Sequence, residues 1–116
     1  MADVALEDNW YDNPLLCPVC KSDNLHHESV EVYHRVEDGS NVRVTSVTGD
    51  EFSSSIMPEK MSGNPSSRRG GIAVAFWCEQ CHGEINGNVP YYYDMFLLQV
   101  IQHKGTTFLN WTVPKK

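Results

Sequence analysis

Residues 72–81 read IAVAFWCEQC, and this stretch decides the fold that the sequence predicts. Large apolar side chains recur here with the period of two of a β-strand, at Ile72, Val74 and Phe76. The strand runs directly into Cys78 and Cys81, whose Cys-x-x-Cys spacing is typical of a tight turn that offers two sulfurs to one metal ion. We therefore predict a β-strand that ends in one half of a metal site.

The other half of the site is predicted at Cys17 and Cys20, which have the same spacing. All cysteines of the chain fall in these two units, and Zn²⁺ prefers a tetrahedron of thiolates with Zn–S distances of about 2.3 Å. We predict one structural Zn²⁺ bound by Cys17, Cys20, Cys78 and Cys81, with iron in the same geometry as an alternative. Because four thiolates leave the ion no position for water, we expect no metal-assisted hydrolysis and no enzyme activity.

The two cysteine units and the strands around them, residues 16–83, resemble the zinc-ribbon superfamily. The chain is also similar to small uncharacterised zinc-ribbon proteins of bacterial and phage genomes. The similarity lies in the paired Cys-x-x-Cys units and in a terminal segment like VIQHKGTTF at residues 100–108. The resemblance implies an all-β fold and a bound metal ion, but no particular activity, because zinc ribbons serve many different machines. The long connection between the units and the acidic charge of the chain depart from the nucleic-acid-binding ribbons.

Three other uses of the cysteines compete with a zinc site. Two disulfides would suit a secreted protein, but the acidic residues 1–8 have none of the features of a secretory signal. The first unit has the spacing of a thioredoxin-like redox motif, yet no βαβ pattern surrounds it. The second unit together with His82 matches the attachment pattern of c-type haem, which also requires export. A zinc site accounts for all four cysteines and needs reduced thiols. Thiols stay reduced in the cytoplasm, so we expect the chain there.

The chain as a whole predicts a single all-β domain over residues 14–116, preceded by a polar tail over residues 1–13. The expected fold is a zinc ribbon extended by hairpins into a small antiparallel sheet. Strands are predicted over residues 25–36 and 41–48, joined by an Asp-Gly turn.

The C-terminal part of the chain predicts a second hairpin. Two apolar runs, residues 95–102 and 106–113, flank the sequence His103-Lys104-Gly105. A helix over residues 91–102 also fits the spacing of the apolar side chains, because short runs satisfy both periods. The tyrosines and threonines next to these runs favour strands.

Residues 49–71 contrast with these strands because serine, glycine and proline dominate them. This composition predicts a long mobile loop, pinned to the body in its first part by Phe52, Ile56 and Met57. The loop carries Arg68 and Arg69, which together with Lys104 are candidate contacts to a partner.

The formal net charge of −6 repels phosphate backbones and favours a protein partner over a nucleic acid. The alternative is a nucleic-acid-binding zinc ribbon that uses Arg68, Arg69, Lys104 and aromatic strand residues. We expect the aromatic side chains in the core rather than on a base-stacking platform, namely Phe76, Trp77, Phe108 and Trp111. No apolar run reaches the roughly 18 residues that a membrane helix needs, so no membrane contact is expected. The histidines are expected at the surface or half-buried, without a catalytic role: His26, His27, His34, His82 and His103.

Overall fold

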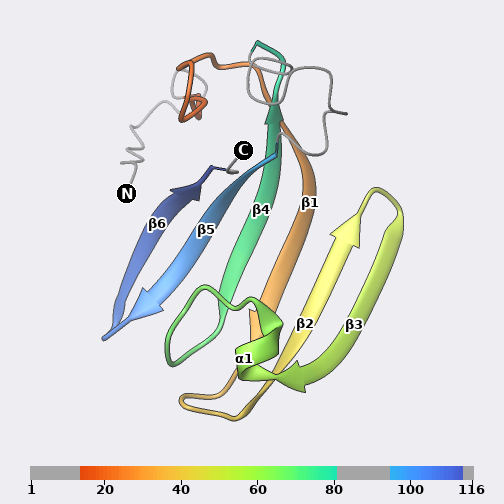
Figure 1. Ribbon diagram of the computed structural model, residues 1–116, viewed down its shortest axis with the longest axis vertical. Helices are drawn as coiled ribbons and strands as arrows, with labels where there is room; N and C mark the ends of the chain where they lie inside the picture. Colours follow the sequence, from red (N-terminus) through yellow and green to blue (C-terminus); the bar gives the residue numbers. More distant parts are fainter. Residues whose placement is uncertain (1–13, 81–94, 114–116) are drawn as a thin grey trace.

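The computed structural model describes residues 14–80 and 95–113, which form a six-stranded antiparallel sheet (Figure 1). The strand order is β3-β2-β1-β4-β5-β6. The elements are β1 (Leu25–His34), β2 (Asn41–Thr48), β3 (Glu51–Pro58), α1 (Glu59–Ser62), β4 (Gly71–Cys78), β5 (Phe96–His103) and β6 (Thr106–Thr112). The predicted all-β class is confirmed, whereas the predicted tail over residues 1–13 lies outside the described residues.

The turns explain why neighbouring strands form hairpins. Lys104 and Gly105 both have positive φ, as a type I′ turn between β5 and β6 requires. Gly49 has positive φ at the first central position of the turn between β2 and β3, which suits a type II′ turn. Asp38 adopts the left-handed conformation in the turn between β1 and β2, where aspartate is tolerated better than most residues.

The predicted long loop over residues 49–71 is wrong in its first half. Residues 51–58 form β3, which pairs with β2 along its whole length, and α1 follows directly. The serine-rich composition hid this strand because β3 is held by its backbone ladder with β2, and none of its side chains is buried. Residues 63–70 are irregular, as the composition predicts.

The alternative helix over residues 91–102 is also wrong for the part that the structure describes. Residues 96–101 of β5 pair with β4 on one side, and residues 97–103 pair with β6 on the other. Residues 91–94 lie outside the described residues. Pairing on both sides overrides a helical spacing that the sequence alone leaves open.

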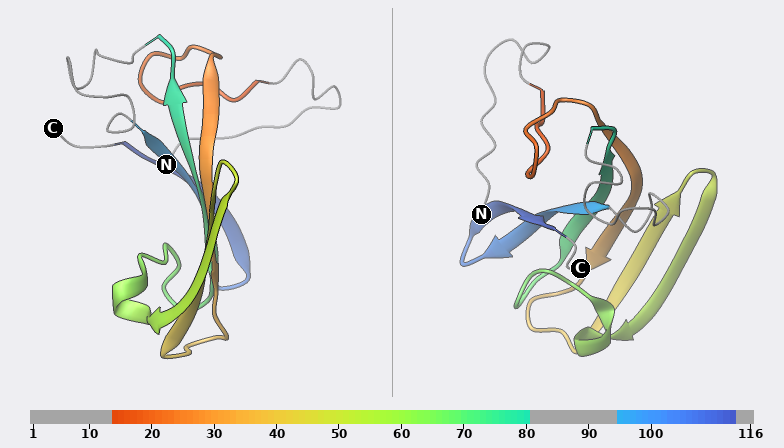
Figure 2. Two further views of the ribbon diagram at one scale, coloured as in Figure 1. Left: turned by 90° about the vertical axis from the view of Figure 1, so that its right-hand side faces the viewer. Right: turned by 45° about the horizontal axis from the view of Figure 1, so that its top comes forward.

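The sheet is a single layer with two small cores, one at each end. One contains Cys17, Cys78 and Phe96, and the other is formed by Tyr33, Val42, Val44 and Ala73. Figure 2 shows α1 on one side of the twisted sheet. The predicted aromatic core is only partly correct: Phe96 and Tyr33 are the aromatic side chains that are buried among the described residues, and the four expected aromatic residues are half-buried.

Candidate metal centre

A tight turn at residues 17–22 prepares the first pair of sulfurs. The amide of Cys17 donates to the carbonyl of Ser22 at 2.8 Å, and the amide of Lys21 donates to the carbonyl of Cys17 at 3.1 Å. Lys21 has a positive φ of 67°, which reverses the chain after Cys20. The amide of Val19 donates to Sγ of Cys17 at 3.4 Å, so the turn directs backbone dipole toward a sulfur, where negative charge is stabilised.

The third sulfur comes from the end of β4, which lies beside the start of β1 because the two strands are antiparallel. Cys78 is the register partner of Leu25, and the amide of Glu79 donates to the carbonyl of Asn24 at 3.2 Å. Figure 1 shows the segment that leads into β1 beside the end of β4. Cys17 and Cys20, which lie in this segment, are therefore close to Cys78.

The sulfurs of Cys17, Cys20 and Cys78 all lie within 4.8 Å of one another. Sγ of Cys20 is 3.5 Å from Sγ of Cys78, which is far longer than a disulfide bond of about 2.05 Å. A tetrahedral zinc site with Zn–S distances near 2.3 Å places its sulfurs about 3.8 Å apart. These three cysteines lie close enough to hold a metal ion.

The surroundings of the cluster suit a bound cation. Cys17 and Cys78 are buried, with 0% and 2% of their surface exposed, whereas Cys20 is exposed. Leu25 and Trp111 pack against the buried pair and Phe96. Ionised sulfurs in such an apolar setting are costly unless a cation compensates them, so the donor set and its burial fit a soft divalent metal.

An exposed pair of side chains, His26 and Glu79, lies beside the cysteines. Nε2 of His26 is 2.8 Å from Oε2 of Glu79, and the ring of His26 stacks on Trp77 with 4.4 Å between ring centroids. Among the described histidines, His26, His27, His34 and His103 are exposed, as the sequence predicts. The His26–Glu79 pair joins β1 to the residue after Cys78 and adds to the contacts that hold the cysteine end of the sheet together.

Two further predicted residues belong to the same region of the sequence. Cys81, the predicted fourth ligand, and His82 lie outside the described residues. The structure brings three of the four predicted sulfur ligands together, and the fourth, Cys81, stays a prediction.

The candidate partner contacts Arg68, Arg69 and Lys104 gather at the opposite end of the sheet, where they line one hollow. Nε and one terminal nitrogen of Arg68 donate to the two carboxylate oxygens of Asp38 at 2.9 and 2.6 Å. Arg69 lies 3.4 Å from Glu37. The hydrogen bonds from Arg68 hold the pKa of the Asp38 carboxyl below its usual value, and the pKa of Arg68 is raised in return. Both arginines are thus already paired with acids.

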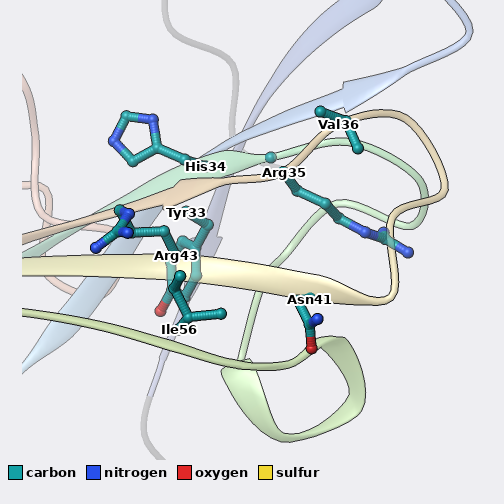
Figure 3. A pocket seen from close by; sticks show the side chains of 8 residues that line it. Tyr33, His34, Arg35, Val36, Asn41, Arg43 and Ile56 are labelled. Carbon is teal, nitrogen blue, oxygen red and sulfur yellow. The ribbon is translucent and has the colours of Figure 1, made fainter.

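A second hollow, shown in Figure 3, opens on the sheet beside α1 and is lined by residues that include His34, Arg43 and Ile56. Its lining contains no carboxylate, cysteine, serine or threonine. It therefore offers no pair of carboxylates for acid–base chemistry.

Sequence reasoning missed the residues that fasten the end near α1. Ser66 is 3% exposed; its hydroxyl donates to the carbonyl of Gly70 at 2.7 Å and accepts from the amide of Gln102 at 3.0 Å. Nothing in the sequence distinguishes Ser66 from the exposed serines around it. Its role depends on β5, which lies far away in the chain.

Comparison of the chain with protein-family models, with curated proteins and with solved structures found no match. Within the described residues, no helix has the length and apolar character needed to cross a membrane. The case for a metal site therefore depends on the cysteine geometry of this chain alone.

Proposed function

We propose that this protein is a non-catalytic binding module stabilised by one structural Zn²⁺ on Cys17, Cys20, Cys78 and Cys81. The observation that carries the proposal is the convergence of three sulfurs from two distant segments. Cys81 follows Cys78 by the same spacing that separates Cys17 from Cys20, so it is the natural fourth ligand. Reduced thiols of this kind are typical of cytoplasmic proteins, which is where we place the chain.

The zinc would act on folding, because it joins the first turn to the end of β4. Residues 14–24 contain exposed Leu16 and Val19 and bury little apolar surface of their own. Structural zinc contributes roughly 10 kcal/mol or more of apparent binding free energy in finger peptides. Four thiolates would leave no open coordination position, which supports a structural and not a catalytic metal.

Metal analysis of the purified full chain tests this proposal. We expect one zinc per chain and a colourless protein, whereas an iron centre would absorb visible light. Replacement of Cys81 by serine should lower the metal content as strongly as replacement of Cys78, and the matched variant His82→Ala should keep it. A purified wild-type protein without metal would contradict the four-cysteine site. So would a Cys81→Ser variant that binds as much metal as the wild-type protein.

The partner is proposed to be a protein that docks on one face of the sheet. A row of apolar side chains crosses this face with one residue from each strand: Phe52, Val47, Val30, Val74, Leu98 and Trp111. Phe52 and Val47 are 71% and 43% exposed, and Ile72 beside the row is 36% exposed. The other members of the row are half-buried, so the exposed apolar surface lies at Phe52 and Val47, and exposed apolar surface of this kind is a feature of interaction sites.

The docking face is tested by cross-linking the full chain to its partners in the cells that express it. Val47→Asp places a charge within the row, so we expect the cross-linked partner to be lost. Ser53→Asp adds the same charge to the opposite face of the neighbouring strand and should leave the partner bound. Equal loss in both variants would mean that charge, and not this face, decides the contact.

A nucleic-acid-binding module is the second candidate, favoured by the gathering of Arg68, Arg69 and Lys104 around one hollow. It is weaker because Asp38 and Glu37 already neutralise the two arginines. Binding of this kind should fall steeply as salt rises, and the double variant Arg68→Ala/Arg69→Ala should abolish it. Salt-independent or undiminished binding would remove this candidate.

A further inference from the structure

We propose that the protein forms a symmetric dimer in which β3 pairs antiparallel with β3 of a second copy, with Phe52 of each copy opposite Ile56 of the other. This inference goes beyond the proposed metal module and does not depend on it, because β2 and β1 lie between β3 and the strand that carries Cys78, β4. The dimer would join two sheets edge to edge.

The first observation is the exposure of β3. It is the outermost strand on its side of the sheet, and among the described residues it pairs with β2 alone. Its apolar side chains Phe52 and Ile56 are 71% and 60% exposed. Edge strands are commonly protected by charged side chains, by proline, by a bulge or by a covering segment, because their free backbone groups pair readily with other strands. In β3 the charged residue and the proline, Glu51 and Pro58, lie at the two ends, and the strand between them pairs with β2 in continuous register.

The second observation is which backbone groups point away from β2. The hairpin has two loop residues, so its closing pair, Thr48 and Glu51, is hydrogen-bonded, and bonded and non-bonded pairs then alternate. Thr45 and Ser54 form a non-bonded pair, in which side chains lie closer, and their hydroxyl oxygens are indeed 3.2 Å apart. The amides and carbonyls of residues 52, 54 and 56 therefore face outward.

Pro58 supports the same alternation. A proline has no amide hydrogen, so it is tolerated in an edge strand where the amide would face solvent. Pro58 lies an even number of residues from Ser54, on the outward phase. The amide of Glu59, on the inward phase, donates to the carbonyl of Ser40 at 2.9 Å.

The third observation is that this free edge matches itself. In an antiparallel pair centred on Ser54, Ser54 faces its own copy, and Phe52 faces Ile56 of the second chain. Residues 52, 54 and 56 are the ones with outward backbone groups, so each free amide meets a free carbonyl. In the same register, the exposed side chain of Phe52 in each copy packs against the exposed side chain of Ile56 in the other. An aromatic residue opposite a β-branched one stabilises a strand pair.

Charge is compatible with this register. Glu51 is the charged residue of β3, and the pairing places it opposite Met57 of the second copy rather than opposite another carboxylate. Ile56 has Arg43 as its neighbour on β2, and Figure 3 shows the two side chains together. The dimer would therefore bring no pair of like charges face to face, although each chain carries a formal charge of −6.

Sedimentation velocity of the metal-loaded full chain tests the proposal. We expect a concentration-dependent monomer–dimer equilibrium in the micromolar range. Phe52→Lys should weaken the dimer at least about tenfold, because it removes two apolar pairs and buries two charges. Thr48→Lys adds the same charge to exposed surface on the neighbouring strand and should leave the dimer intact. Both positions are exposed, and circular dichroism should show that both variants fold.

A mixing experiment tests the register. Ile56→Glu alone should weaken the dimer as Phe52→Lys does. When the two variants are mixed, Lys at position 52 faces Glu at position 56 across the heterodimer, and the other pair keeps Phe opposite Ile. We expect the mixture to associate at least about tenfold more tightly than either variant alone. A protein that is monomeric throughout, a dimer unaffected by Phe52→Lys, or a mixture that shows no rescue would overturn the proposal.

Discussion

The two ends of the sheet are held together in different ways. At the cysteine end, three sulfurs within 4.8 Å of one another, a buried phenylalanine and one exposed His26–Glu79 pair join the first turn to β4. At the end near α1, the irregular residues 63–70 are fastened by direct hydrogen bonds. Arg35 donates to the carbonyls of Gly39 and Ser67, and Ser66 bridges Gly70 and Gln102.

The difference teaches where each end obtains its stability. The end near α1 satisfies its own polar groups, and Arg35 also lies 3.6 Å from Glu59 of the helix. The cysteine end gathers sulfurs that gain little from one another as neutral thiols and much from a shared cation. The first end should therefore fold without help, and the second should depend on metal.

Chelation should separate the two ends with the largest effect. Removal of the metal, or replacement of Cys78 by serine, should cost about 5 kcal/mol or more, because structural zinc supplies folding free energy directly. Hydrogen exchange followed by mass spectrometry should show lost protection at residues 17–25. Protection around α1 should persist longest, and a uniform loss at both ends would contradict the comparison.

Gly70→Ala should damage the end near α1 without touching the cysteines. A Cβ at Gly70 would overlap the carbonyl oxygen of Tyr33, a backbone atom that has no room to move aside. We expect a loss of about 2–3 kcal/mol in the free energy of unfolding, measured by urea denaturation, with zinc content unchanged. Gly49→Ala is the control: nothing lies within 4 Å of its Cβ, so it should lose only about 1 kcal/mol to its positive φ.

Ser66→Ala should have a smaller effect at the same end. It removes one hydroxyl and leaves the amide of Gln102 and the carbonyl of Gly70 without that partner. The expected loss is about 1–2 kcal/mol in urea denaturation. The exposed neighbour Ser67 provides the comparison, since Ser67→Ala should change stability by less than about 0.5 kcal/mol.

Asp38→Asn should have the smallest effect, and the effect should depend on pH. Asn keeps the left-handed conformation of the turn but loses the ion pair with Arg68. The pKa of Asp38 is lowered in the folded chain, so its contribution is complete above the ordinary carboxyl pKa and is lost as pH falls through the lowered value. The wild-type advantage in Tm should be slight at neutral pH and vanish in strong acid. An advantage that grows with acid would show that the pair does not stabilise the fold.

The strands with clear alternation were predictable, and the serine-rich strand was not. β4 alternates Ile, Val and Phe, so its period is visible locally, whereas β3 presents Phe52 and Ile56 among serines. The cysteine cluster was predictable because metal ligands have a fixed chemistry and spacing. The serine that fastens residues 63–70 was not, because its partner on β5 is remote in sequence.

The sequence by itself determined the all-β class, the principal hairpins and which cysteines are candidate metal ligands, since period, turn residues and cysteine spacing are local properties. The tertiary structure alone decided that three of those sulfurs meet, that β3 lies at an open edge and that Ser66 is buried. Each of these depends on strand order and register, which are set by backbone pairing between segments far apart in the chain.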